Sequence, residues 1–168
     1  HHAEKDRNQL SRTRRGRVRG LRERDAHLHA DNLPGRRQSR DQHPRRAAEL
    51  FLSASIKGFA KAQYNLGVMY ADGNGVPQDF KQAYVWTREA AEQRVAKAQF
   101  ILGVMYGQGR GVPQDDQKAY AWVSVAAVNG VGQAAEVRDS VARELTPAAL
   151  AEAQTLADVY IVLYSPQS

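Results

Sequence analysis

The sequence contains no cysteine, which excludes disulfide bonds and thiolate metal sites. Histidine is absent from the rest of the chain after His43, which is the last of the five histidines. Residues 47–168 therefore cannot form a Ser–His or Cys–His catalytic pair. His27 and His29 have no third ligand placed to complete a metal site, so we expect neither a metal nor a cofactor.

Long apolar runs are also missing. No run approaches the roughly 20 residues that a helix needs to cross a bilayer, and we expect no membrane span. The chain starts at His1 rather than at Met, and no positively charged segment followed by an apolar one comes after it. We therefore expect the N-terminus to be incomplete, and the compartment stays open between cytoplasmic and periplasmic or secreted.

Aromatic residues are absent from the first 46 residues, where arginine dominates. This segment holds 13 Arg and one Lys against six acidic residues, whereas residues 47–168 hold ten basic and twelve acidic residues. Its few large apolar side chains cannot offset an ordering cost of ~1–2 kcal/mol per residue, so we predict a disordered Arg-rich tail over residues 1–46. Two further interpretations stay open. The arginines could bind nucleic-acid phosphates, or the segment could be a non-native extension translated from the wrong reading frame.

The remaining residues repeat themselves at an interval of 36. "GVMYADGNGVPQD" (67–79) and "GVMYGQGRGVPQD" (103–115) agree at ten of thirteen positions. One interval upstream, residues 47–59 match only the second half of the unit, and after Val131 the pattern decays. Repeats of 20–50 residues are typical of stacked units. We therefore predict a half repeat (47–59), two full repeats (60–95 and 96–131) and C-terminal capping helices (132–163).

Within each unit the spacing predicts two antiparallel helices. A stripe at i, i+4, i+7 and i+8 marks the first helix: Ala62, Leu66, Met69 and Tyr70. Glycines then end this helix, and Asp79 is placed to cap the next one, with Gln82 completing a capping box. Trp86 and Trp122 occupy equivalent positions on the second helix of each unit, and we expect both to be buried. In the half repeat, the apolar side formed by Leu50, Phe51 and Ala54 is expected to lack a partner.

The stretch "AKAQYNLGVMYADGNGVPQDFKQAYVWTREAAEQR" (60–94) resembles the Sel-1-like repeat of bacterial proteins, a tetratricopeptide-related α/α unit. The resemblance implies an all-α solenoid, a right-handed superhelix of about two full 36-residue helical hairpins, with a half repeat before them and capping helices after them. It also implies an adaptor whose concave surface binds other proteins. Arg94 departs from the pattern, because Gly58 and Gly130 hold glycine at the equivalent junctions.

A protein-binding surface is the function that we predict. Apolar side chains lie on the first helix of each unit, opposite its core stripe, where polar residues would be expected if that side only faced water. The proposed surface consists of Lys61, Tyr64, Asn65, Val68, Phe100 and Val104. The competing interpretation is that Tyr64 and Phe100 pack against the neighbouring repeat, as aromatic stripes usually do.

An enzyme is the alternative from another class, since some relatives have been described as β-lactamase-like. Acyl transfer of that kind needs an activated serine, typically with a lysine one helical turn away. None of the eight serines has lysine three residues later. We therefore predict a non-catalytic module whose partner is a protein or peptide of unknown identity, with nucleic acid possible only through residues 1–46.

Overall fold

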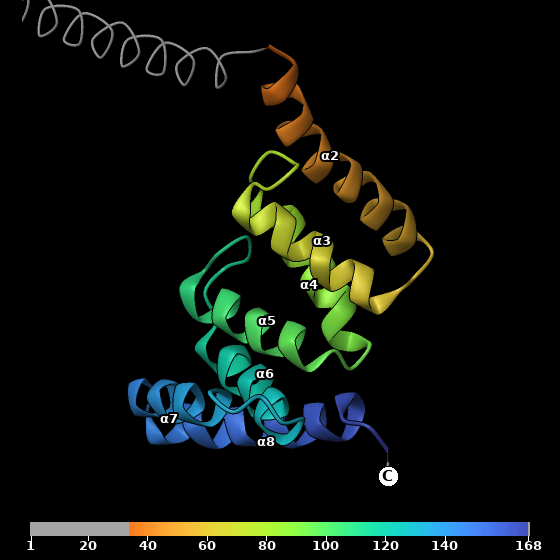
Figure 1. Ribbon diagram of the computed structural model, residues 1–168. Coiled ribbons are helices and arrows are strands. Elements are labelled where there is room, and N and C mark those ends of the chain that lie inside the picture. The colour runs from red at the N-terminus through yellow and green to blue at the C-terminus, as the bar shows by residue number, and fades with distance from the viewer. Residues whose placement is uncertain (1–33, 168) are drawn as a thin grey trace, which may run out of the picture. The chain divides into compact units, whose positions relative to one another are not determined.

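The computed structural model describes residues 34–167, and the side chains of residues 42–167. The chain divides into two units between His43 and Pro44. Every described element is an α-helix, as predicted, and the described residues contain no strand. The helices are α2 (Pro34–Ile56), α3 (Ala60–Asp72), α4 (Phe80–Glu92), α5 (Ala96–Gln108), α6 (Asp116–Val128), α7 (Ala134–Glu144) and α8 (Pro147–Tyr164) (Figure 1). None of these helices is both long and apolar enough to span a bilayer.

Helix α2 begins earlier than the predicted half repeat. The Arg-rich tail was expected to reach residue 46, whereas α2 starts at Pro34 and continues through Pro44. Proline is favourable at the first position of a helix, because its φ is already helical and its missing N–H is not needed there. Arginine and glutamine, which follow it, are good helix formers. The structure thus differs from the expected tail over residues 34–46, while residues 1–33 lie outside the described part.

Two consecutive hairpins follow, α3–α4 and α5–α6. Helix α3 packs on α4, α4 on α5, and α5 on α6. Gly73 and Gly109 end the first helix of each hairpin in the left-handed conformation, with φ of 68° and 63°. Glycine suits this position because it has no Cβ to clash. The two glycine-rich stretches are therefore corners between antiparallel helices.

Aspartates begin the second helix of each hairpin. Asp79 accepts hydrogen bonds from the backbone N–H groups of Lys81 and Gln82, at 2.9 and 3.1 Å. Asp115 accepts one from the N–H of Lys118 at 3.0 Å. The expected capping box is only half formed, because the Asp79 N–H donates to the carbonyl of Tyr70 instead. This bond ties the end of the loop back to the preceding helix.

Small residues let the two helices of a hairpin approach closely. A Cβ on Gly67 would lie 2.6 Å from Oγ1 of Thr87, and a Cβ on Gly103 would lie 2.7 Å from Cγ1 of Val123. Gly75 and Gly111 are restricted by α2 and α4, since a Cβ on Gly75 would overlap the backbone carbonyl of Pro44 and a Cβ on Gly111 that of Phe80. Both contacts recur at the 36-residue interval, which explains why the glycines recur with them.

Buried glutamines link one unit to the next. Nε2 of Gln99 donates to the carbonyl of Ala91 at the end of α4, and Oε1 of Gln99 accepts from Asn129 at 2.7 Å. Gln63 makes the same two contacts one unit earlier, with the Ser55 carbonyl and Gln93. A buried amide is stable only when its polar atoms are hydrogen-bonded. These glutamines therefore favour one register between adjacent hairpins.

The C-terminal helices cover α6, since both α7 and α8 pack against it. Trp122 is 4% exposed and stacks on Tyr164, with ring centroids 4.9 Å apart. Tyr160 lies at the same distance from Trp122. The carbonyl of Tyr164 accepts from Gln99 at 3.0 Å, so α8 also joins the glutamine network. Helices α7 and α8 therefore cover α6 on the side away from α5, and their role as a cap stays a prediction.

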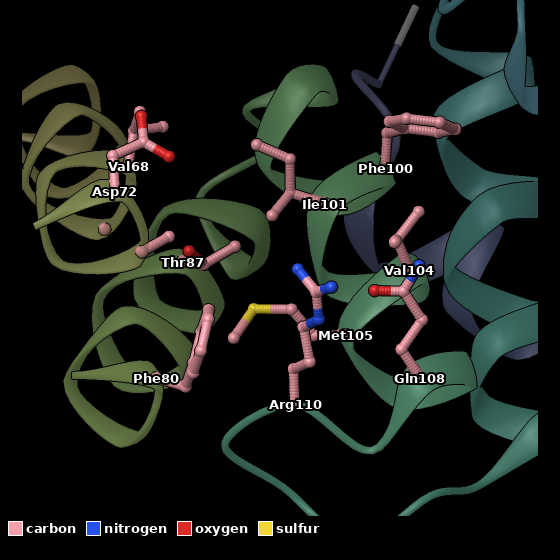
Figure 2. A pocket seen from close by; sticks show the side chains of 12 residues that line it. Val68, Asp72, Phe80, Thr87, Phe100, Ile101, Val104, Met105, Gln108 and Arg110 are labelled. Atoms are coloured by element: carbon pink, nitrogen blue, oxygen red, sulfur yellow. The ribbon is translucent and has the colours of Figure 1, made fainter. Parts of the chain in front are cut away.

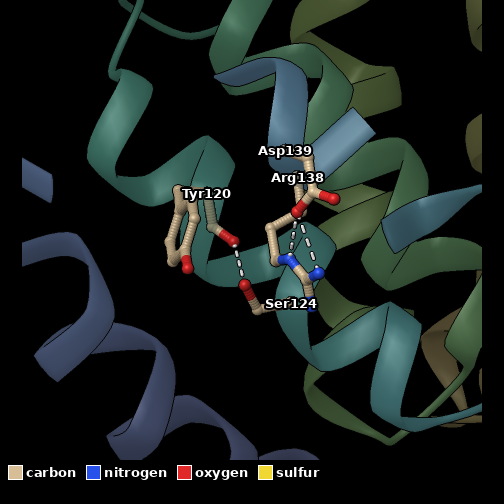
Figure 3. Close-up of polar contacts among 4 residues, drawn as sticks. All are labelled: Tyr120, Ser124, Arg138 and Asp139. Carbon is tan, nitrogen blue, oxygen red and sulfur yellow. Dashed lines mark hydrogen bonds and ion pairs between the residues drawn. The ribbon is translucent and has the colours of Figure 1, made fainter. Parts of the chain in front are cut away.

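Figure 3 shows two polar contacts, one within α6 and one within α7. The hydroxyl of Ser124 donates to the carbonyl of Tyr120 in its own helix, at 2.7 Å, so this buried side chain needs no partner from another helix. On α7, Arg138 pairs with Asp139 at 2.9 Å. Because Asp139 is exposed, this pair contributes little to stability.

Two core predictions hold only in part. Trp86 is half-buried rather than fully buried, and its Nε1 atom is enclosed without a hydrogen-bond partner. Trp122, by contrast, is covered by Tyr160 and Tyr164 of α8. In the half repeat, Leu50 is 72% exposed as expected, whereas Phe51 and Ala54 are half-buried.

Candidate binding surface

The first pocket on the predicted surface lies between α3 and α5 and is closed on one side by α4. This α3–α5 pocket has a volume of about 220 Å³. Figure 2 shows most of its lining side chains. The lining consists of Gly67, Val68, Ala71, Asp72, Phe80, Thr87, Phe100, Ile101, Val104, Met105, Gln108 and Arg110. The pocket is therefore formed by two adjacent repeats, and its walls are mainly apolar.

A second pocket adjoins the N-terminal end of α5. This α5–loop pocket has a volume of about 660 Å³, and the loop between α6 and α7 forms its other side. Its lining consists of Tyr64, Ala96, Lys97, Phe100, Ile101, Asn129, Gly130, Val131, Gly132 and Gln133. Phe100 and Ile101 line both pockets. The two pockets consequently follow one another along the same helix.

Four of the six predicted surface residues line these pockets. Val68 and Val104 line the α3–α5 pocket, Tyr64 lines the α5–loop pocket, and Phe100 lines both. Lys61 is exposed and Asn65 is half-buried. Neither of these two residues lines either pocket. The structure thus brings the apolar members of the predicted set together around α5.

The competing packing interpretation also finds support at one residue. Tyr64 packs against the core cluster that includes Leu102 and Ala98, so its ring stabilises the stack as well as lining a pocket. Val68, Phe100 and Val104 are half-buried. Half-buried apolar side chains at a pocket can gain further contacts from a bound chain, because burying the remaining apolar area is favourable by ~25 cal/mol per Å².

Polar groups are few and lie around the α3–α5 pocket. The guanidinium of Arg110 lies over the ring of Phe80, 5.4 Å from its centroid, a cation–π contact. In Figure 2 this guanidinium extends from the loop after α5 toward Met105. Asp72 lines the same pocket from the end of α3. An apolar site with one cation and one anion among its lining residues suits an apolar side chain flanked by polar backbone.

The titratable groups with shifted pKa values line neither of these two pockets. Burial raises the pKa of Tyr106, and the hydrogen bond between its hydroxyl and that of Tyr84, 2.9 Å long, raises this pKa further. Burial also raises the pKa of Tyr160. The carboxylate of Glu92 raises the pKa of Arg88. Within residues 42–167 no cluster of three or more His, Asp or Glu side chains is placed to hold a metal.

Several residues of the site could not be found from helical periodicity alone. Phe80 begins α4 and Arg110 lies in the loop after α5, so neither belongs to the stripe on α3 or α5. Ile101 lies next to Phe100 and lines both pockets. Its equivalent one unit earlier is Asn65. The repeat signal therefore pointed to the polar member of this pair and missed the apolar one.

Comparison with known proteins identifies the repeating unit. Residues 60–95 and 96–130 match the model of the Sel1 repeat, within one residue of the predicted boundaries. Sel1 repeats are generally protein–protein interaction modules. No curated protein sequence is significantly similar to this chain.

Two solved structures are similar to the chain. One is c5321, a protective antigen of uropathogenic Escherichia coli with an SLR fold, which is 39% identical with a TM-score of 0.70. The similarity covers 73% of this chain and 26% of that one. The other is a Sel1 repeat protein from Oxalobacter formigenes, 36% identical with a TM-score of 0.55, over 56% of this chain and 38% of that one. The chain thus spans well under half the length of either relative.

Proposed function

We propose that this chain, in which residues 60–95 and 96–130 match the Sel1 repeat, is a non-catalytic adaptor that binds a peptide segment along α5. The observation that carries this proposal is the pair of adjoining pockets on that helix, which share Phe100 and Ile101. Apolar side chains of the partner would enter both pockets. The general role of Sel1 repeats in protein interaction supports the proposal.

Stable binding of a peptide requires contacts in both pockets. Burying one Val, Leu or Phe side chain contributes about 1.5–3 kcal/mol, which is too little to offset the cost of association alone. Two anchors that share Phe100 roughly double this contribution. The residues of α5 that line the two pockets are centred about five residues apart, or roughly 8 Å along the helix. An extended peptide places side chains i and i+2 about 7 Å apart on one face, so we expect apolar anchors at alternate positions.

Selection of peptides tests the proposal. A library of random peptides is selected against the full chain, and the enriched peptides are measured by fluorescence polarisation. The proposal predicts alternating apolar anchors and a dissociation constant that rises about tenfold for Val104→Gln, equivalent to ~1.4 kcal/mol. Val85→Gln is the matched control, because Val85 is 46% exposed on α4 and lines neither pocket.

Thermal unfolding separates binding from packing. If the valine serves only the stack, Val104→Gln lowers the melting temperature while the affinity for the selected peptides stays within twofold of the wild type. That result, or equal loss of affinity in the Val85→Gln control, contradicts the proposed site. A loss of affinity for Val104→Gln with an unchanged melting temperature supports it.

A further inference from the structure

A third pocket lies between α2, the C-terminal half of α3 and the loop after α3. This Ala48 pocket has a volume of about 350 Å³. Leu66 and Tyr70 of α3 line it, together with Val76 of the following loop. Ala48 of α2 is 3% exposed and lines the pocket from the opposite side. It shares no lining residue with the α3–α5 and α5–loop pockets.

The equivalent positions one repeat later show which side chain fits the Ala48 pocket. One interval later, the equivalents of Leu66, Tyr70 and Val76 are Leu102, Tyr106 and Val112. The residue equivalent to Ala48 is a tyrosine, Tyr84.

Tyr84 and Val112 pack against the core cluster that contains Leu102 and Tyr106. The Tyr84 ring meets the Tyr106 ring edge to face, with centroids 5.8 Å apart and an interplanar angle of 87°. The two hydroxyls are hydrogen-bonded at 2.9 Å. The same walls therefore enclose a phenol ring in one interface and form a pocket in the other.

We propose that the Ala48 pocket binds a para-substituted phenol, such as the side chain of a tyrosine. The bound ring takes the position that Tyr84 occupies one repeat later, with its edge against Tyr70 and its hydroxyl bonded to the Tyr70 hydroxyl. Tyr70 is half-buried, so its ring is accessible from the pocket. Arg45 and Glu49 also line the pocket, and they supply a hydrogen-bond donor and an acceptor for the backbone of a peptide.

Titration with three small probes tests this inference on the full chain. N-acetyl-tyrosinamide, N-acetyl-phenylalaninamide and p-cresol are added while proton–nitrogen correlation spectra are recorded. We expect saturable shifts at Leu66, Tyr70 and Val76, with the tyrosine amide binding about fivefold more tightly than the phenylalanine amide. That factor corresponds to one net hydrogen bond of about 1 kcal/mol. Binding of p-cresol without the tyrosine amide assigns the site to a free phenol, whereas saturable binding by neither probe overturns the inference.

Two variants locate the site. Ala48→Tyr places the chain's own ring in the pocket, so phenol binding is lost and the melting temperature rises. Tyr70→Phe keeps the ring but removes the hydroxyl, so the preference for the tyrosine amide over the phenylalanine amide disappears. Unchanged binding in Ala48→Tyr, or an unchanged preference in Tyr70→Phe, overturns the inference.

Val104→Gln is the control for the α3–α5 pocket. It is expected to leave phenol binding unchanged, because Val104 does not line the Ala48 pocket. If Val104→Gln weakens phenol binding as strongly as Ala48→Tyr does, the site is misplaced. The proposed peptide site on α5 can fail without affecting this result, and the reverse also holds.

Discussion

Alanine substitutions at two glycines of α5 should have opposite effects on stability. Gly103 and Gly107 lie four residues apart on the same helix, so the substitutions bring the same gain in helix propensity, about 0.5–1 kcal/mol. Their surroundings differ. A Cβ on Gly107 meets only the Cβ of Ala119, at 3.5 Å, which is an ordinary contact. Gly107→Ala is therefore expected to stabilise the chain.

Gly103→Ala is expected to destabilise it. The new Cβ would lie 2.7 Å from Cγ1 of Val123, 3.1 Å from the Val123 nitrogen and 3.2 Å from the Ala119 carbonyl oxygen. The valine side chain can rotate, but the two backbone atoms move only if α6 shifts as a whole. Overpacking of this kind costs about 1–3 kcal/mol, which exceeds the helix-propensity gain. The two variants should thus differ by about 1–3 kcal/mol.

Urea unfolding followed by circular dichroism at 222 nm measures this difference in the full chain. For a chain of this size, 1 kcal/mol corresponds to about 2–4 °C in melting temperature, so thermal unfolding provides a second readout. Gly67→Ala extends the comparison, because its Cβ would lie 2.6 Å from Oγ1 of Thr87. If Gly103→Ala proves as stable as Gly107→Ala, the close contact between α5 and α6 is refuted.

Three further predictions concern caps, junctions and pH. Arg94→Gly should raise the free energy of unfolding by about 1 kcal/mol, because Arg94 has a φ of 67° that a non-glycine residue adopts only with strain; calorimetry showing no gain would contradict this. Asp79→Ala should cost about 1 kcal/mol in urea unfolding by removing two cap hydrogen bonds, whereas the exposed Asp158→Ala, which is mid-helix, should cost little. Absorbance at 295 nm should show that Tyr106 and Tyr160 ionise only above the usual tyrosine range near pH 10, because burial raises the pKa of both. Their folded-state pKa lies above the unfolded value near 10, so their contribution to stability should be fully present below about pH 10 and be lost as pH rises beyond it; a rise in stability above about pH 10 would contradict this assignment.

The repeat architecture was predictable because the same local rules act twice. Apolar spacing predicted α3 and α5, and the glycines that end these helices take the left-handed conformation, which glycine adopts without steric strain. Asp79 and Asp115 cap the next helices as their positions indicated. Arg94 was recognisable as an exception because Gly58 and Gly130 hold the equivalent positions, and all three have positive φ.

Contacts between adjacent repeats were harder to predict from the sequence. Gln99 is fully buried, yet a glutamine in an isolated helix is expected to face water. Its partners are the carbonyls of Ala91 and Tyr164, which lie 8 residues before it and 65 residues after it. Recurrence of glutamine at residues 63 and 99 was the available signal, but recurrence alone does not distinguish a buried amide from an exposed one.

The pockets were harder to predict, because each is lined by residues from several helices and loops. Periodicity on α3 and α5 selected Val68, Phe100 and Val104, which line them. It could not select Phe80 or Arg110, because these residues enter from the start of another helix and from a loop. Periodicity could not predict the Ala48 pocket either, because its walls come from α2, α3 and the loop after α3.

Mapping a selected peptide onto the full chain tests the proposed adaptor role most directly. Methyl and backbone resonances are assigned, and the shifts caused by the tightest peptide are followed to saturation. The adaptor role along α5 predicts that the largest shifts fall on Phe100, Ile101 and Val104, with smaller ones at Val68 and Tyr64. Largest shifts on α4 around Val85, or on α8, would contradict it.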